Sequence, residues 1–234
     1  MMKLLSVDTN AKTMKSTSKG YLTGILYMYP NKKTCPHAEI AGCSAWRDGL
    51  CLVNAGLASV YKSVNLARQR KTDLFFNDQK TFFVQLIKDI NSLIKRAERM
   101  DLIPIVRLNG TSDIRYEYII VHDNKNIFDL FPNVQFYDYT KISQRLNHKI
   151  TNYDLTFSYS AKPEYAKQVT TAIAFKSRIA VVFSKKIPEK FLGMDVIDGD
   201  KHDLRFIEQR NVIVGLIAKG KARNVESGFV INAI

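Results

Sequence analysis

The chain has 234 residues, 46% of them hydrophobic and 24% charged, a composition typical of a soluble globular protein with one sizeable core. Lysine and arginine number 35 against 22 acidic residues, giving a formal net charge of +13. This excess favours polyanionic partners such as nucleic acid, a nucleotide or another phosphorylated molecule. No stretch reaches the roughly 18 apolar residues of a membrane span, which excludes a transmembrane protein.

The N-terminus and the cysteine content predict where the protein works. The apolar run before Asp8 is much shorter than the core of a signal peptide, so we expect a cytoplasmic protein. In that reducing compartment three clustered cysteines are unlike a disulfide framework. They favour metal binding or redox chemistry instead.

The first predicted strand covers residues 21–30, where β-forming residues end at a proline. All three cysteines follow in one loop, residues 31–56. A helical pattern comes next, from about Leu52 to Lys71. Its last turns are cationic, which suits the carboxyl end of a helix dipole. The cations there are Arg68, Arg70 and Lys71.

The clearest periodic signal predicts a second helix that ends near Met100, because its apolar residues repeat at intervals of three and four. Asn77 or Asp78 can cap its start. We expect its apolar stripe to pack onto the outer face of a sheet. The stripe includes Phe83, Leu86, Ile90 and Leu93.

Five later apolar segments predict further strands. They begin near Ile103, Val134, Asp154, Ile179 and Val212. Helical pieces lie between several of them, the clearest over residues 163–173, where proline occupies the first turn. A hairpin or loop is expected around residues 193–203. Strands and helices therefore alternate through about six units, and the connections are long enough for parallel crossovers.

This order predicts a single α/β domain over residues 1–234, built on one parallel sheet. The sheet is expected to be open or curved into a partial or full TIM-like barrel. In both versions, catalytic and ligand-binding residues lie at the carboxyl ends of the strands. The cysteine loop and the polar loop at 109–113, which follow the first two parallel strands, should therefore share one rim.

Three thiols in one polar loop point to a metal centre, because thiolates are good ligands for iron–sulfur clusters and for zinc. Their spacing is C-x7-C-x7-C, without the close pairs of structural zinc sites. Cys35, Cys43 and Cys51 fit best a four-iron cluster that leaves one iron open for a substrate or cofactor. Zinc is the alternative, with His37 as a further ligand, and three buried free thiols are the structural alternative.

This layout resembles the radical SAM superfamily, whose partial barrel carries a three-cysteine cluster loop directly after the first strand. In that superfamily a polar, glycine-containing stretch after the second strand holds the amino group of S-adenosylmethionine, and "LNGTSD" lies in the matching position. The resemblance implies a cluster on the cysteines with S-adenosylmethionine beside it. The implied cofactor-side residues are Asn109, Gly110, Thr111, Ser112 and Asp113.

Several segments are similar to a phage and prophage family called gene product 88, and the similarity extends over most of the chain. The segments are "TCPHAEIAGC", "ARQRKT", "RLNGTSDI" and "VIDGDKHDLRF". The resemblance implies a viral origin, in which case the cytoplasm is that of an infected host cell.

The leading hypothesis is a phage-encoded iron–sulfur enzyme of radical-SAM-like architecture that acts on a nucleotide or nucleic acid. Its phosphate-facing charges would be Arg68, Arg70, Lys71 and Lys219. One rival is a non-enzymatic protein that binds nucleic acid or a host factor, with a structural cysteine loop. Another is a metal-dependent nuclease. Its carboxylates would be Asp113, Glu117, Asp198 and Asp200. Because no base-reading motif is recognisable, binding to nucleic acid is expected to be electrostatic and independent of sequence.

Overall fold

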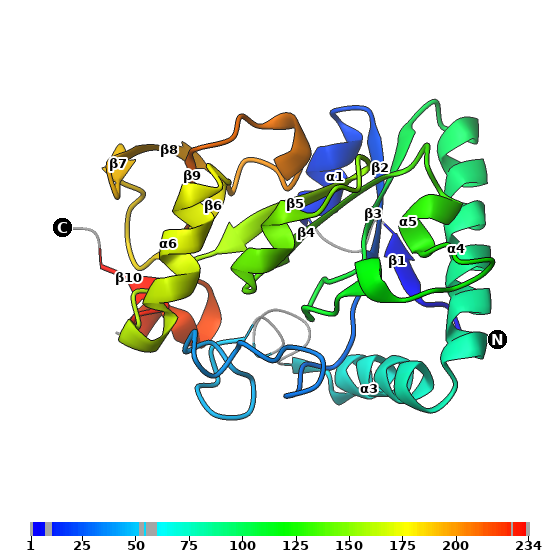
Figure 1. Cartoon of the computed structure of the whole chain (residues 1–234), viewed down its shortest axis with the longest axis horizontal. Helices are drawn as coiled ribbons and strands as arrows, with labels where there is room; N and C mark the ends of the chain where they lie inside the picture. Colours follow the sequence, from blue (N-terminus) through cyan, green and yellow to red (C-terminus); the bar gives the residue numbers. More distant parts are fainter. Residues whose placement is uncertain (1, 8–10, 52–53, 55–59, 226, 233–234) are drawn as a thin grey trace.

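The structure is a computed structural model that describes residues 2–7, 11–51, 54, 60–225 and 227–232. Its centre is one ten-stranded sheet with the order β1-β2-β3-β4-β5-β6-β9-β8-β7, and β10 pairs with β6 (Figure 1). The strands are β1 (Leu5–Val7), β2 (Tyr21–Leu26), β3 (Ile103–Arg107), β4 (Gln135–Thr140), β5 (Tyr153–Ser158), β6 (Ile179–Phe183), β7 (Lys190–Phe191), β8 (Met194–Asp198), β9 (Ile213–Ile217) and β10 (Val230–Ile231).

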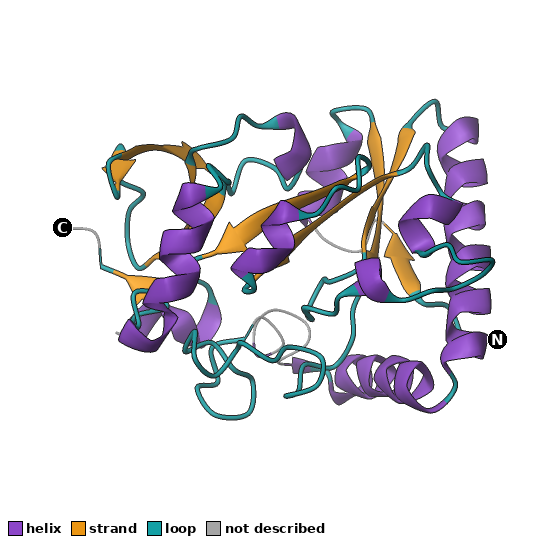
Figure 2. Ribbon diagram, in the orientation of Figure 1, coloured by secondary structure: helices purple, strands orange, loops and turns teal. Residues whose placement is uncertain are grey.

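Short and long helices connect these strands (Figure 2). The α-helices are α1 (Ala11–Thr17), α3 (Lys62–Asn77), α4 (Gln79–Arg99), α5 (Ile127–Leu130) and α6 (Ala166–Ala174). The 3-10 turns are η2 (Tyr116–Tyr118), η3 (Ser143–Asn147), η4 (Pro163–Tyr165), η5 (Arg205–Ile207) and η6 (Gly220–Asn224). Across the described residues, no helix is long and apolar enough to span a bilayer.

The six predicted strands are confirmed, and they lie parallel in one sheet. The sheet stays open, as in one of the two expected versions, and the predicted TIM-like barrel is wrong. A barrel closes only when its two outer strands pair with each other, whereas here the outer strands are β1 and β7. Both are short and antiparallel to their single neighbours, so the parallel register ends before the sheet can close.

Helix α4 confirms the predicted amphipathic stripe. Phe83, Leu86, Ile90 and Leu93 are at most 4% exposed. They belong to the core under β1, β2 and β3, and α4 contacts all three strands. Asp78 caps the helix by accepting a hydrogen bond from the Thr81 backbone N–H at 3.0 Å, as expected for this residue type.

The helix predicted from about Leu52 to Lys71 is correct only in part. Helix α3 begins at Lys62 and continues to Asn77, beyond the expected end. The cationic cluster therefore lies in the middle of the helix and not at its carboxyl end. Most of residues 52–59 lie outside the described residues.

The cysteine loop leaves the carboxyl end of β2 and has little regular structure as far as Cys51. Its buried residues Cys35 and Cys43 join a second core, which also contains side chains from β5 and β6. Strand β5 pairs only with the first two residues of β6, and β10 pairs with Val182 and Phe183 farther along the same strand. The sheet therefore parts between β5 and β6 toward its carboxyl edge, where the cysteine loop lies.

Candidate metal centre

The cysteine loop and the 109–113 loop touch at the carboxyl edge of the sheet. The Asp113 backbone N–H donates to the Thr34 carbonyl at 2.7 Å. The Thr111 hydroxyl donates to the carbonyl of Met28 at 2.5 Å. The predicted common rim is confirmed, because parallel strands β2 and β3 deliver both loops to the same end of the sheet.

Three free thiols at this rim act electrostatically on one amine, although among the described residues they are not gathered closely enough to hold a metal ion. Cys35 and Cys43 are buried and Cys51 is half-buried. The amine of Lys141, the first residue after β4, lies near enough to Cys43 to lower the pKa of that thiol, against the larger effect of burial. All three cysteines act electrostatically on Lys141. We call Cys35, Cys43, Cys51 and Lys141 the thiol cluster.

Burial sets the protonation of this cluster. It raises the pKa of Cys35 to about 12 and that of Cys43 to about 11. Burial by itself would lower the pKa of Lys141, but the negative charge of ionised cysteines and of Asp113 opposes burial and raises that pKa above its ordinary value. At neutral pH the two buried cysteines are therefore neutral thiols beside a charged ammonium.

The backbone of Lys141 is fixed on both sides. Its N–H donates to the Asp113 carboxylate at 2.8 Å. Its carbonyl accepts a hydrogen bond from the Tyr165 hydroxyl at 2.8 Å, and Nδ1 of His37 lies 3.2 Å from the same oxygen. These contacts come from three different segments of the chain, so the start of the lysine side chain is held firmly against the cysteine loop.

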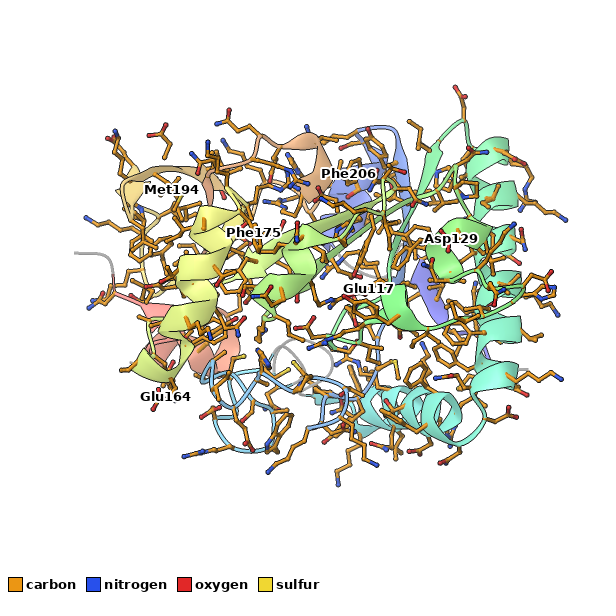
Figure 3. All side chains as sticks on the ribbon, in the orientation of Figure 1. Glu117, Asp129, Glu164, Phe175, Met194 and Phe206 are labelled. Atoms are coloured by element: carbon orange, nitrogen blue, oxygen red, sulfur yellow. The ribbon has the colours of Figure 1, made fainter. Side chains whose placement is uncertain are left out.

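A second charged group lies beside the thiol cluster, around Arg145 in η3. Arg145 is 2% exposed and binds the carboxylates of Asp113 and Glu117, in the latter case through two hydrogen bonds at 2.7 and 2.9 Å. It also donates to the Tyr153 hydroxyl at 2.9 Å. Glu117 reaches this group from η2, near the middle of the molecule (Figure 3). We call these four residues the Arg145 cluster.

The side chains of the 109–113 loop make internal hydrogen bonds. Asn109 donates to Asp138 and to the Ile114 carbonyl, and its own oxygen accepts from the Ser112 hydroxyl at 2.8 Å. Gly110 is packed so closely that a Cβ would lie 2.7 Å from Ile25. These contacts explain the loop's sequence by packing, and its role in binding a cofactor stays a prediction.

The four predicted phosphate-facing cations are in different surroundings. Lys71 is 8% exposed and donates to the Leu4 carbonyl at 2.7 Å, and burial lowers its pKa to about 8. Lys219 forms an ion pair with Asp200 at 2.9 Å, whereas Arg70 is exposed. Arg68 is half-buried. The structure therefore does not gather these four charges into one phosphate site.

A family model described as gene product 88 matches residues 3–233 of the chain. The chain belongs to the gene product 88 family. The predicted phage gene-product family is thus confirmed, and the radical SAM resemblance gains no support from the comparisons. No curated protein and no solved structure matches the chain.

In this family member, Arg68 is the predicted phosphate-facing cation on which a cysteine, Cys51, acts electrostatically. Its guanidinium sits 5.0 Å from the centre of the Tyr27 ring. Its pKa is lowered by burial, and Cys51 opposes that effect electrostatically. The Nη1 atom is buried and has no hydrogen-bond partner. A buried guanidinium nitrogen without an acceptor is costly unless an anionic group comes to meet it.

The three cysteines are chemically suitable ligands for a metal centre, on the condition that their side chains can come closer together. As the described residues stand, no three His, Cys, Asp or Glu groups are close enough together to hold a metal ion. The cysteine side chains would have to turn inward and lose their protons on binding. Lys141 and Arg68 would then face an anionic centre, which suits their charge.

Sequence reasoning missed Lys141 and Arg145. Neither belongs to a recognisable motif, since "TKISQR" reads as an ordinary polar segment after a strand. The position of this segment was an available signal, because residues that directly follow a parallel strand lie at the carboxyl edge of the sheet. Three of the four acidic residues proposed for a nuclease are engaged in ion pairs: Asp113 and Glu117 bind Arg145, and Asp200 binds Lys219. The fourth, Asp198, accepts a hydrogen bond from the Asp200 backbone N–H at 2.9 Å.

Proposed function

We propose that this phage protein holds an iron–sulfur cluster on Cys35, Cys43 and Cys51 and acts on a nucleotide or nucleic acid. The observation that carries the proposal is the thiol cluster itself. Three cysteines from one loop act electrostatically on a single ammonium at the edge of the sheet where α/β proteins bind ligands. When bound, the cluster would supply redox or Lewis-acid chemistry at this edge.

Charge balance supports a metal–thiolate centre over three inert thiols. Three thiolates carry three negative charges, whereas the metal ion or iron–sulfur core that they bind carries a charge of about 2+. The loaded centre is therefore anionic. The Lys141 ammonium and the unpartnered Nη1 of Arg68 would then be stabilised by it. A purely structural thiol group would gain nothing from a cation placed among its sulfurs.

Zinc in a non-enzymatic nucleic-acid-binding protein is the second candidate, and His37 favours it. The contact between His37 Nδ1 and the Lys141 carbonyl, at 3.2 Å, matches the way a metal-binding histidine is usually oriented. With a proton on Nδ1, the Nε2 atom is left as a ligand. His37 and the three thiols would then supply the four ligands of a tetrahedral site.

S-adenosylmethionine is a further part of the proposal that depends on the cluster. Its support is the contact between the Asp113 N–H and the Thr34 carbonyl, which brings the 109–113 loop to the cysteine loop. The side chains of Asn109 and Ser112 already bind each other. Any contact to such a cofactor would therefore come mainly from the backbone or require rearrangement of these bonds.

Metal analysis of anaerobically purified protein tests the centre. We expect about four iron and four sulfide per chain with visible charge-transfer absorption. Single changes of Cys35, Cys43 or Cys51 to alanine should each lower the iron content severalfold. Ser44→Ala is the matched control, because it removes a buried hydroxyl from the same loop without removing a thiol.

Three outcomes would contradict the iron–sulfur proposal. Stoichiometric zinc without iron would establish the second candidate. Colourless, metal-free protein after anaerobic reconstitution would reject both centres. Equal iron loss in Ser44→Ala and the cysteine variants would mean that the loop's fold, and not its thiols, governs iron content.

A further inference from the structure

The exposed face of α4 carries a row of cations. Lys80, Lys88, Lys95 and Arg99 are all exposed. At 3.6 residues per turn, they fall within an arc of about 100° and extend over about 28 Å of the helix. This face lies opposite the apolar stripe that packs onto the sheet, at the end of the molecule formed by β1, β2 and β3.

These four cations have no ion-pair partner among the residues that the structure describes. Some surface cations elsewhere do have one: Lys32 pairs with Glu39, and Lys190 is 3.8 Å from Asp195. The acidic Asp89 of α4 faces the core, where it accepts hydrogen bonds from the Leu4 and Leu5 backbone. The other acidic residue of α4, Glu98, is exposed. With four cations against this one carboxylate, the exposed face of α4 stays strongly positive.

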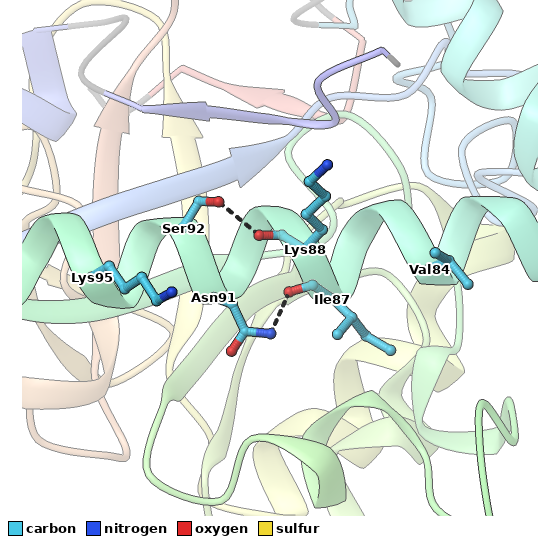
Figure 4. Close-up of a pocket in the computed structure, with 6 residues that line it drawn as sticks. All are labelled: Val84, Ile87, Lys88, Asn91, Ser92 and Lys95. Atoms are coloured by element: carbon cyan, nitrogen blue, oxygen red, sulfur yellow. Dashed lines mark hydrogen bonds between the residues drawn. The ribbon is translucent and has the colours of Figure 1, made fainter.

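An open depression lies in the middle of this row (Figure 4). It is lined by Val84, Ile87, Lys88, Asn91, Ser92 and Lys95. The Ser92 hydroxyl donates to the Lys88 carbonyl, and the Asn91 amide donates to the Ile87 carbonyl. Since the helix itself satisfies these donors, the depression offers a ligand two ammonium groups and apolar side chains.

We propose that this face of α4 binds the phosphodiester backbone of nucleic acid. The cations follow one another at about 12, 10 and 6 Å along the helix, and they meet a polyanion that presents one charge per roughly 1.7 Å of duplex. The ammonium groups bind phosphates as point charges, while Val84 and Ile87 can contact sugars. Apart from these cations the face offers few free hydrogen-bonding groups, so its contacts are expected to go mainly to phosphates and to depend little on base sequence.

The inference rests on nucleic acid as the partner in the proposed function, and it places that partner on a defined surface. It does not require the metal centre, because α4 and the cysteine loop are separate parts of the structure. A continuous row of unpaired cations suits a regularly charged polymer better than an acidic protein, whose charges alternate with other side chains.

Binding of a mixed-sequence 20-base-pair DNA duplex, measured by fluorescence anisotropy at several salt concentrations, tests the proposal. The double variant Lys88→Glu/Lys95→Glu should bind the duplex at least about tenfold more weakly than the unmodified chain. The slope of log K, the logarithm of the association constant, against the logarithm of the salt concentration should be smaller in magnitude by about 2. Lys88→Gln/Lys95→Gln should lie between it and the unmodified chain.

The matched control changes the same charge on the other side of the protein, with Lys167→Glu/Lys176→Glu in and just after α6, where both lysines are exposed. It should stay within about threefold of the unmodified chain. Equal losses in the two double variants would overturn the proposal, since net charge alone would then explain binding. Poly-glutamate that competes as well as DNA at equal charge would also overturn it.

Iron and sulfide are measured on the same samples. Weak binding by the α4 variant with its metal content unchanged supports the surface independently of the centre. If the unmodified chain binds no duplex even at low salt, the inference and the nucleic-acid part of the proposed function both fail, whereas the metal result stands separately.

Discussion

Two cations, Lys141 and Arg145, lie within five residues after β4. The groups around Arg145 are charged, whereas those around the Lys141 amine are mainly neutral. Arg145 is enclosed by the carboxylates of Asp113 and Glu117, with a tyrosine hydroxyl completing its hydrogen bonds. Lys141 faces thiols that burial keeps protonated. Both cations are joined through Asp113, which binds the Arg145 side chain and the Lys141 backbone.

The difference separates a structural group from a candidate binding group. In the Arg145 cluster the charges are compensated before any ligand arrives, so the group can hold the loops in place. In the thiol cluster, negative charge develops only when the cysteines ionise, and a metal promotes that ionisation. A charged side chain whose nearest partners are neutral marks the place where an anionic centre would fit.

The largest effect expected from a single substitution is the loss of Arg145. Arg145→Met should lower the free energy of unfolding by about 3–5 kcal/mol, because it leaves two buried carboxylates without their cation. Arg145→Lys should recover only part of this loss, since an ammonium cannot reproduce the forked guanidinium bonds. Urea unfolding followed by circular dichroism gives both values.

Arg115 provides the control for that prediction. It is exposed and lies in the same segment as Asp113 and Glu117. Arg115→Met should change the free energy of unfolding by less than about 0.5 kcal/mol. If Arg145→Met is equally mild, the Arg145 cluster contributes little to stability, and the contrast with the thiol cluster disappears.

The next effect is a loss of stability at high pH in the metal-free protein. The folded-state pKa values of Cys35 and Cys43, about 12 and 11, exceed the ordinary value of 9.0. The folded chain therefore holds these protons more tightly than the unfolded chain. The resulting stability is complete below pH 9 and is lost as pH rises toward 11 and 12, by about 1.4 kcal/mol per pH unit for each thiol.

Comparison with Cys35→Ala/Cys43→Ala isolates that contribution. The double variant should show a shallower decline of unfolding free energy between pH 9 and 11 than the unmodified chain, in otherwise identical urea titrations. Parallel curves would show that these thiols ionise alike in both states, and that burial does not hold them protonated.

The smallest effect on stability is expected at Lys141. Lys141→Met keeps the length of the side chain and removes the ammonium, so the metal-free protein should lose no more than about 1 kcal/mol. Iron retention under mild chelation should nevertheless fall severalfold. Lys162→Met is the control, because Lys162 packs against Gly42 of the same loop. Unchanged iron retention in Lys141→Met would remove Lys141 from the centre.

Much of the fold followed from the sequence, because local patterns decide it. The apolar repeat of α4 and the continuous apolar strands are visible residue by residue, and they gave the parallel sheet. Closure into a barrel was not predictable in this way. It depends on how the outer strands end, and the three residues of β1 and the hairpin of β7 and β8 carry no local signal of their pairing partners.

The candidate site was predictable only for residues whose type suggests a ligand and whose place after a strand puts them at the carboxyl edge of the sheet. The three cysteines stand out by residue type, and the strand order placed their loop beside 109–113. The burial of Lys71 was not predictable, because a charged residue in a basic segment looks solvent-exposed until the tertiary fold buries it against Leu4. Lys141 and Arg145 gain their roles from contacts with segments far away in the chain, which no local pattern encodes.

The short outer strands also bear on how the protein can associate with others. Strand β1 has three residues and β7 has two, so within the part of the chain that the structure describes the sheet offers almost no free row of backbone groups on which a foreign strand could extend it. Assembly by strand addition, and the runaway aggregation that shares its geometry, are thereby disfavoured. Partners must instead recognise side chains, through surfaces whose charge, and therefore whose response to salt, can be changed one residue at a time.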